Sequence, residues 1–400
     1  MNRTTFSCIS NFRPYKMKKN TKISTYYTFI LLPSLICGLL FLLSYILLSK
    51  AGEFNHIKDT AQQVKQYNSR YGPALHNMTY QYKMALYTDT KPDIVAFGSS
   101  RVMQFQASSF KVPFVNMGGI SGLLESLQLS NDMLNVHKPK TVIWGLDFWW
   151  FNEHYTEPIS LPRHNRHLSQ LKPALDLLTK PYIWLIENKF KFTEIMALLK
   201  SPKNSNVGTI AIIRKDGYDA YGSYYYNAIT TGKVKSEDTQ FQRDLSRIKN
   251  TKKIYQKSPI ISETKWQQFL TTLYNFQQEG IDVILFMPPT APPITSAMSL
   301  SENYPILNQL NLRLSQLDLD YYDFHDAFNS LGSTACEFID GHHAGAITYR
   351  RILVQMANAS ERFEKKINLN EVGNTIQNNR GYASYPHDGE IDFLNLGCPK

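Results

Sequence analysis

A hydroxyl, an imidazole and a carboxylate occur in two short motifs of this 400-residue chain. The first motif is GSS, residues 98–100, which ends a short apolar run. The second is FIDGHHAG, residues 338–345, in which Asp340 and His343 stand three residues apart. That spacing allows the carboxylate to hold one ring nitrogen while the other accepts a proton from a hydroxyl. The motifs therefore predict that His343 and Asp340 activate Ser100 as a nucleophile.

Two more motifs could serve the same chemistry. FVNMGGISG, residues 114–122, has consecutive glycines, whose backbone N–H groups can converge on a developing oxyanion. VIWGLDFWWFN, residues 142–152, ends a third apolar run. Ligands of open parallel sheets bind outside the carboxyl ends of the strands. The four motifs are therefore expected to meet at one sheet edge.

The elements that must position these residues are those of an α/β domain with a parallel sheet, residues 91–365. The predicted strands are 94–97, 114–115, 141–146, 283–286 and 321–324. The predicted helices are 123–134, 263–279, 306–317 and 346–364. The alternation stops between about 150 and 260, which we expect to be an insertion or lid. Residues 50–90 are predicted to be a stalk or leading helix, and 366–400 a weakly structured tail.

The N-terminal region predicts a membrane anchor. Residues 1–25 carry six basic and no acidic side chains, and residues 26–49 carry no charge. The uncharged stretch is long enough to cross a bilayer as a helix, and a basic flank stays in the cytoplasm. We therefore expect a single-pass protein of the cell membrane with an extracytoplasmic domain from about residue 51. A cleaved signal peptide and a buried helix are the alternatives.

Charge and cysteine usage limit the possible partners. The formal charge is +10, but most of the excess lies in the N-terminal tail, so no nucleic-acid surface is predicted. Cys336 and Cys398 would face an oxidising space and could pair, which the sequence leaves open. No cluster of Cys and His has zinc spacing, so neither a metal nor a cofactor is predicted.

The four motifs, in this order and each after a strand or before the last helix, resemble the SGNH (GDSL-like) hydrolase superfamily. The anchor and the GSS form of the first motif are most similar to its membrane-anchored branch. That branch includes the D-alanyl transfer protein of teichoic acid synthesis and acetyltransferase-like proteins of exopolysaccharide assembly. The resemblance covers roughly residues 90–360 without the insertion. It implies a flavodoxin-like three-layer sandwich with a mostly parallel five-stranded sheet.

The resemblance also implies roles for single residues. Ser100 matches the nucleophile, and its own N–H matches the first oxyanion donor. Gly118 matches the second donor, with Gly119 as a close alternative. Asp340 and His343 match the remaining triad members, and His342 is the neighbour that could be taken for the base.

The third motif departs from the family pattern, because Asp147 stands where asparagine normally donates a hydrogen bond. An ionised carboxylate there would repel an oxyanion. Either Asp147 is protonated, or it has another task, or Asn116 or Arg101 supplies the missing donor. Arg101 could instead contact an anionic substrate group and Trp149 could stack on a sugar ring. A surface arginine and a core tryptophan are equally open readings.

The expected function is therefore that of a serine O-acyltransferase that modifies a cell-surface polysaccharide. The resemblance implies a multi-span membrane acyltransferase as partner, which would deliver the acyl group across the bilayer. A carbohydrate esterase or deacetylase of the same fold is the first alternative. A non-catalytic glycan-binding or assembly protein is the second, and the aspartate at position 147 is the feature that favours it.

Overall fold

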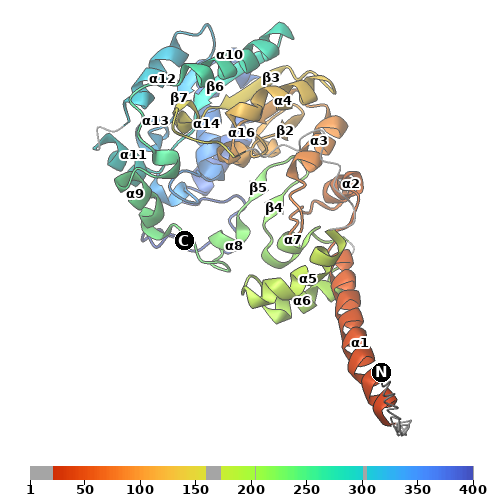
Figure 1. The fold of residues 1–400 in the computed structure, drawn as a ribbon. Helices are drawn as coiled ribbons and strands as arrows, with labels where there is room; N and C mark the ends of the chain where they lie inside the picture. The colour runs from red at the N-terminus through yellow and green to blue at the C-terminus, as the bar shows by residue number, and fades with distance from the viewer. Residues whose placement is uncertain (1–20, 159–172, 203, 301–303, 400) are drawn as a thin grey trace, which may run out of the picture.

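A five-stranded parallel sheet organises the chain (Figure 1). The computed structural model describes residues 21–158, 173–202, 204–300 and 304–399. The sheet order is β2-β1-β3-β6-β7, the doubly wound order 2-1-3-4-5. The strands are β1 Ile94–Phe97, β2 Phe114–Asn116, β3 Thr141–Gly145, β6 Asp282–Met287 and β7 Tyr321–Asp323. The predicted strands and the predicted α/β parallel sheet are confirmed.

Helices cover both faces of the sheet. Trp144 of β3 packs at a ring-centroid distance of 5.2 Å from Phe269 of α10. Phe286 of β6 pairs with Gly145, the residue after Trp144, so its side chain points to the opposite face of the sheet. There it meets Phe105, which packs 4.7 Å from Tyr349 of α14. The sheet is therefore the middle of three layers.

Most predicted helices are confirmed. These are α4 Leu123–Leu134, α10 Glu263–Gln278 and α12 Pro305–Ser315. The last predicted helix is divided at Ser360 into α14 Ala346–Ala359 and α15 Glu361–Glu364. The short helices α11 Pro292–Ser299 and α13 Ala327–Leu331 complete this part of the fold.

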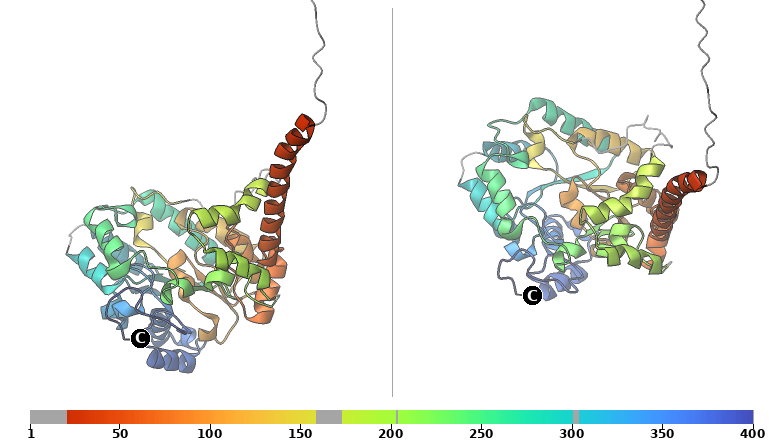
Figure 2. Two further views of the ribbon diagram at one scale, coloured as in Figure 1. Left: turned by 90° about the horizontal axis from the view of Figure 1, so that it is seen from below. Right: turned by 60° about the horizontal axis from the view of Figure 1, so that its bottom comes forward.

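Helix α1, Thr21–Lys50, projects away from the domain (Figures 1 and 2). Its segment Phe29–Lys50 is the one helix among the described residues that is long and apolar enough to cross a membrane. Only 11% of that segment's apolar window is buried in the protein. Residues 1–20, which hold most of the basic tail, lie outside the described residues.

The segment expected to be a stalk or leading helix belongs to the domain. It folds as α2 Ile57–Tyr67 and α3 Thr79–Thr90. Helix α3 packs against β2, and its residues Tyr82, Lys83 and Tyr87 are fully buried. The leading-helix interpretation is therefore the better one.

The predicted insertion forms a layer of short elements beside the sheet. Of it, 159–172 lie outside the described residues. Its elements are α5 Pro173–Ile186, α6 Phe192–Ala197, α7 Thr209–Arg214, β4 Gly217–Tyr218, β5 Tyr224–Tyr225, α8 Asn227–Thr230 and α9 Gln242–Lys249. Strands β4 and β5 pair as a small antiparallel hairpin in the tyrosine-rich stretch.

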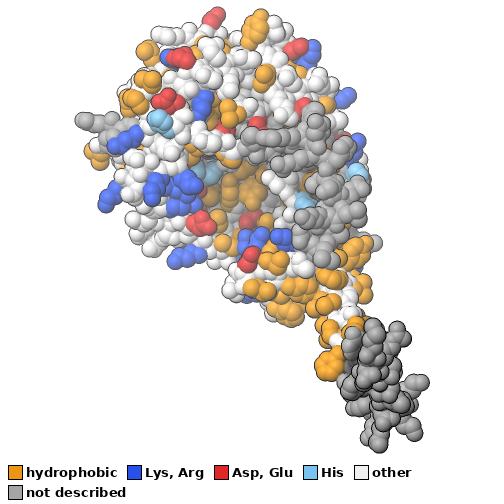
Figure 3. All heavy atoms as spheres, in the orientation of Figure 1, with side chains coloured by type: hydrophobic (Ala, Val, Ile, Leu, Met, Phe, Trp, Pro, Cys, Tyr) orange, Lys and Arg blue, Asp and Glu red, His pale blue; other side chains and the backbone are white. Residues whose placement is uncertain are grey.

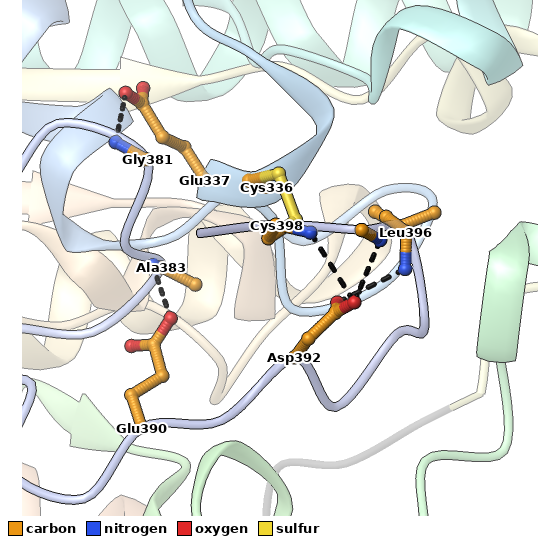
Figure 4. The surroundings of a disulfide bond; sticks show 9 residues. Cys336, Glu337, Gly381, Ala383, Glu390, Asp392, Leu396 and Cys398 are labelled. Atoms are coloured by element: carbon orange, nitrogen blue, oxygen red, sulfur yellow. Dashed lines mark hydrogen bonds between the residues drawn. A yellow bond between two sulfur atoms is a disulfide. The ribbon is translucent and has the colours of Figure 1, made fainter. Parts of the chain in front are cut away.

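The prediction of a weakly structured C-terminal tail is wrong. Helix α16, Leu369–Asn378, packs on α14 and buries Val372. Beyond it, Cys398 forms a disulfide with Cys336, and Asp392 accepts backbone N–H groups of the last turn (Figure 4). Of the glycines and asparagines that suggested disorder, those within 369–378 belong to α16, and Gly381, Gly389, Asn395 and Gly397 take positive φ beyond it.

Candidate active site

Ser100 begins a tight 3-10 turn, Ser100–Gln104, just after strand β1. Strand β1 lies between β2 and β3, where the winding of the sheet reverses and ligands usually bind. Gly98 makes the turn possible with a φ of +138°. A Cβ at Gly98 would lie 2.7 Å from the carbonyl oxygen of Gly145 at the end of β3. The sequence thus folds so that the Ser100 turn sits directly over two strand ends.

The structure brings Ser100, His343 and Asp340 together in one line of hydrogen bonds. Ser100 Oγ lies 2.8 Å from His343 Nε2. His343 Nδ1 lies 2.9 Å from Asp340 Oδ2 and 3.0 Å from Asp340 Oδ1. The three side chains are partly buried. This is the geometry in which an imidazole can take the serine proton while the carboxylate steadies the resulting imidazolium.

The loop before α14 holds Asp340 in its ionised form. Its Oδ1 accepts the backbone N–H groups of His342 and His343, and its Oδ2 lies 3.1 Å from Arg243 Nη2. Burial disfavours the charge, but the neighbouring imidazoles and these hydrogen bonds outweigh it and hold the pKa of Asp340 well below its ordinary value. The carboxylate that contacts His343 Nδ1 is therefore negatively charged.

The glycine loop after β2 is pinned by Asn116. The Asn116 side chain donates to the carbonyls of Val102 and Phe105 and accepts the N–H of Gly118 at 2.9 Å. The N–H of Gly119 donates to the Gly98 carbonyl. Both predicted glycine donors are thus engaged within the protein, and an oxyanion role for Gly118 or Asn116 stays a prediction that requires one of these bonds to be exchanged.

The Ser100 backbone N–H is the better placed oxyanion donor. Within the described part of the chain it has no hydrogen-bond acceptor. It also belongs to the residue whose hydroxyl would attack. A carbonyl oxygen bound there would therefore sit beside the reacting atom.

Asp147 forms a buried ion pair with Arg101. Arg101 Nη1 lies 3.1 Å from Asp147 Oδ1, and each side chain is 1% exposed. The other Arg101 nitrogens donate to the carbonyls of His342, Pro288 and Pro289. Burial raises the pKa of Asp147, and the adjacent guanidinium opposes that rise. The structure therefore favours a structural role for Asp147, in which its carboxylate holds the Arg101 guanidinium in place.

Four of the five N–H groups of the Arg101 guanidinium thus bond to the protein, and the second N–H of Nη1 has no acceptor among the described residues, so its contact with a substrate anion stays a prediction. Its charge faces Trp149 at 5.1 Å from the ring centroid. Trp149 is buried to 95% yet lines a cavity, so its predicted sugar-stacking role stays a prediction.

A second imidazole–carboxylate pair lies beside the first. His342 Nδ1 is 2.6 Å from Asp244 Oδ2, and Asp244 comes from α9 in the insertion. Burial opposes protonation of His342, but Asp340 and Asp244 outweigh it and raise the pKa of its imidazole. Sequence reasoning missed Asp244, because nothing in the sequence links the insertion to the loop of residues 338–345.

Of the three triad residues, Ser100 lines a cavity of about 300 Å³. His342 and the aromatic residues Trp149, Trp150 and Tyr155 also line it. Glu157 lines the cavity too, and its carboxylate accepts the first N–H groups of α4, at Leu123 and Leu124. Burial raises the pKa of Glu157 to about 7. Aromatic rings beside polar side chains such as Ser121 and Glu157 suit a sugar, because its ring faces stack on aromatic rings and its hydroxyls need hydrogen-bond partners.

Asp340, His342 and His343 also have ligand atoms within 4.8 Å of one another, as a shared cation would need. In the structure these atoms bond to one another, to Ser100 and to Asp244. That pattern is the one expected of a proton relay, and the predicted absence of a metal stays a prediction.

Comparison with known proteins assigns no family. None of the established family models matches this chain, and no curated protein is similar to it at a significant level. The geometry of the site therefore carries the functional argument.

Proposed function

We propose that this chain is a membrane-anchored, extracytoplasmic serine O-acyltransferase of the SGNH (GDSL-like) type that acts on a cell-surface polysaccharide. The observation that carries the proposal is the 2.8 Å contact of Ser100 Oγ with His343 Nε2, backed by Asp340. The strand order and the position of the nucleophile after β1 support the family part of the proposal.

The proposed reaction has two halves. Ser100 Oγ attacks the acyl carbonyl of the donor while His343 Nε2 takes its proton, and the Ser100 N–H binds the oxyanion. The tetrahedral intermediate then expels the donor's leaving group, which receives the proton from His343. In the second half a sugar hydroxyl gives its proton to His343 and attacks the acyl-serine. The second tetrahedral intermediate then expels Ser100 Oγ, which takes that proton back from His343, so the acyl group passes to the sugar and Ser100 is restored.

A carbohydrate esterase would use the same first half, with water as the acceptor in the second. The aromatic residues that line the cavity support a sugar ligand in both cases. Resemblance to the membrane-anchored branch favours transfer, with the acyl group supplied through a multi-span membrane acyltransferase. Deletion of the protein separates the two readings, since the acyl content of the envelope glycan falls for a transferase and rises for an esterase.

Two observations support the extracytoplasmic location. One is helix α1 with its apolar segment of 22 residues. The other is the Cys336–Cys398 disulfide, because disulfides persist in oxidising compartments and are rare in the cytosol.

The non-catalytic alternative rested on the charge of Asp147. The Arg101 guanidinium neutralises that charge, so repulsion of an oxyanion is no longer an argument against catalysis. The triad geometry favours the enzyme over the binding protein.

A fluorophosphonate probe tests the proposal on the full-length chain in membranes. We expect labelling of the wild type, none in Ser100→Ala and weak labelling in His343→Gln. Ser121→Ala is the matched control, since Ser121 lines the same cavity without a hydrogen-bond partner for its hydroxyl among the described residues. Labelling that survives in Ser100→Ala, or its absence in the wild type, contradicts the enzyme.

A further inference from the structure

Helix α5 lies against α1 rather than over the sheet (Figure 1). The Tyr182 hydroxyl donates to the carbonyl oxygen of Leu40 within α1. Trp184 packs into an apolar cluster with Leu47 and Leu48. Part of the insertion therefore runs alongside the helix that we expect to cross the membrane.

The depth of this contact follows from the length of α1. A hydrocarbon core of about 30 Å takes about 20 helical residues. Even if that core began immediately after Lys22, the last charged residue before the stretch, it would extend to about Leu42. Leu40 then lies inside the hydrocarbon, and Tyr182 lies at the same depth.

The outer surface of this region also carries large apolar side chains, next to exposed polar ones such as Glu187 and Lys191. Ile186, at the end of α5, is 80% exposed, and Phe192 on α6 is 65% exposed. Figure 3 shows hydrophobic side chains gathered on the underside of the domain, beside the upper part of α1. Residues 177–186 of α5 carry a single charged side chain, Lys180. Large apolar side chains in such a patch are stable when lipid covers them.

Cations and aromatic rings are combined at the border of the patch. The Lys189 ammonium lies 5.6 Å from the ring of Trp184 and 5.8 Å from that of Phe190. Arg214 lies 4.8 Å from the Phe190 ring. Aromatic residues with lysine and arginine are typical of the membrane–water interface, where the cations reach lipid phosphates.

We propose that residues 177–197, here called the shoulder, are embedded in the leaflet on the domain side of the membrane. The partner is the lipid itself, because the shoulder continues the lipid-facing surface of α1. This inference rests on the membrane anchorage in the proposed function. It adds a second attachment point to α1, which fixes how the domain is held on the bilayer.

A chain of packing and hydrogen-bond contacts connects the shoulder to the active site. Ile213 of α7 packs into the same apolar cluster, and α7 leads directly into the β4–β5 hairpin. In that hairpin the Tyr224 carbonyl accepts from Gln104, at the end of the Ser100 turn. These contacts hold the cavity at a fixed distance from the membrane surface. A fixed distance suits an acceptor glycan that is still attached to the membrane or is growing from it.

Depth-dependent fluorescence quenching tests the shoulder in the full chain. A fluorophore is attached to Ile186→Cys or Phe192→Cys, in a background with Cys8→Ser and Cys37→Ser, and the protein is reconstituted into phosphatidylcholine–phosphatidylglycerol vesicles. Phe328→Cys is the matched control, a phenylalanine of α13 that is 59% exposed. We expect acyl-chain-brominated lipid to quench positions 186 and 192 at least about fivefold more than position 328.

A fluorophore on the native Cys37 separates the two possible failures. Quenching at Cys37 but not at 186 and 192 overturns the shoulder and leaves the anchor. Absence of quenching at Cys37 overturns the membrane anchorage itself. Quenching at 186 that falls as protein density in the vesicle rises would show a second copy, rather than lipid, covering the patch, and would also overturn the proposal.

Discussion

Arg101 Nη1 and Asp147 Oδ1 lie 3.1 Å apart in the protein interior, and each side chain is 1% exposed. Arg101 directly follows the proposed nucleophile, and Asp147 follows strand β3. Arg101 also binds the carbonyl oxygen of His342, next to the proposed base. One buried guanidinium thus ties the serine turn, the third strand end and the histidine loop together.

Removal of the guanidinium should destabilise the domain strongly. Arg101→Met leaves the Asp147 charge buried without its partner, which should lower the free energy of unfolding by about 3–5 kcal/mol. Urea denaturation of the detergent-solubilised chain measures this. Lys365→Met, which breaks the exposed pair with Glu361, is the control and should change it by less than about 1 kcal/mol. Equal effects of the two substitutions would show that the buried pair has no special structural role.

Asp340→Asn should leave the fold intact and slow the attack of Ser100 on an electrophile. The amide cannot hold the imidazole in the required tautomer or stabilise its charge, so the rate should fall by about 10³–10⁴-fold. The second-order rate constant of fluorophosphonate labelling is the readout. Asp318→Asn, an exposed aspartate, should react like the wild type. A rate for Asp340→Asn within a factor of a few of the wild type would remove Asp340 from the mechanism.

His342 should make stability depend on pH. Its pKa is raised in the folded state, despite burial and Arg101, because Asp340 and Asp244 face it. A raised pKa stabilises the fold fully below the unfolded value of about 6.5 and loses that contribution as the pH rises through the folded value. The difference in unfolding free energy between wild type and His342→Gln should therefore shrink with increasing pH above about 6.5. A difference that grows with pH would contradict the charged pair.

The disulfide should contribute substantially to stability. It closes a loop with a sequence separation of 62 residues. The chain-entropy relation gives about 4 kcal/mol for a loop of this length. A reducing agent should therefore lower the urea midpoint of the wild type and leave a Cys336→Ser, Cys398→Ser variant unchanged. An equal response of both proteins would mean that the bond is not formed.

The sequence was informative wherever local patterns decide structure. Apolar β-branched runs predicted the five strands within a residue at each end. The three-residue spacing of Asp340 and His343 predicted their contact, because a tight turn brings such neighbours together. The meeting of Ser100 with His343 needed more than the strand-end rule, because the loop of His343 precedes helix α14 instead of following a strand, and the prediction rested on the residue types and on the family resemblance.

Contacts between distant segments could not be predicted in this way. Asp244 lies in the insertion and reaches His342 through tertiary packing alone. The shoulder contacts α1 because both are apolar, a property that does not specify a partner. The C-terminal segment has a polar composition typical of disorder, yet a disulfide and a few buried side chains order it.

In the proposed reaction Ser100 carries the acyl group during turnover. Mass spectrometry of peptides from the full-length protein, quenched during reaction with para-nitrophenyl acetate, tests this most directly. We expect an acetyl group on the peptide of Ser100, absent in Ser100→Ala and in His343→Gln. Release of nitrophenol by the wild type with Ser100 unmodified, or with the acetyl group on another side chain, would contradict it.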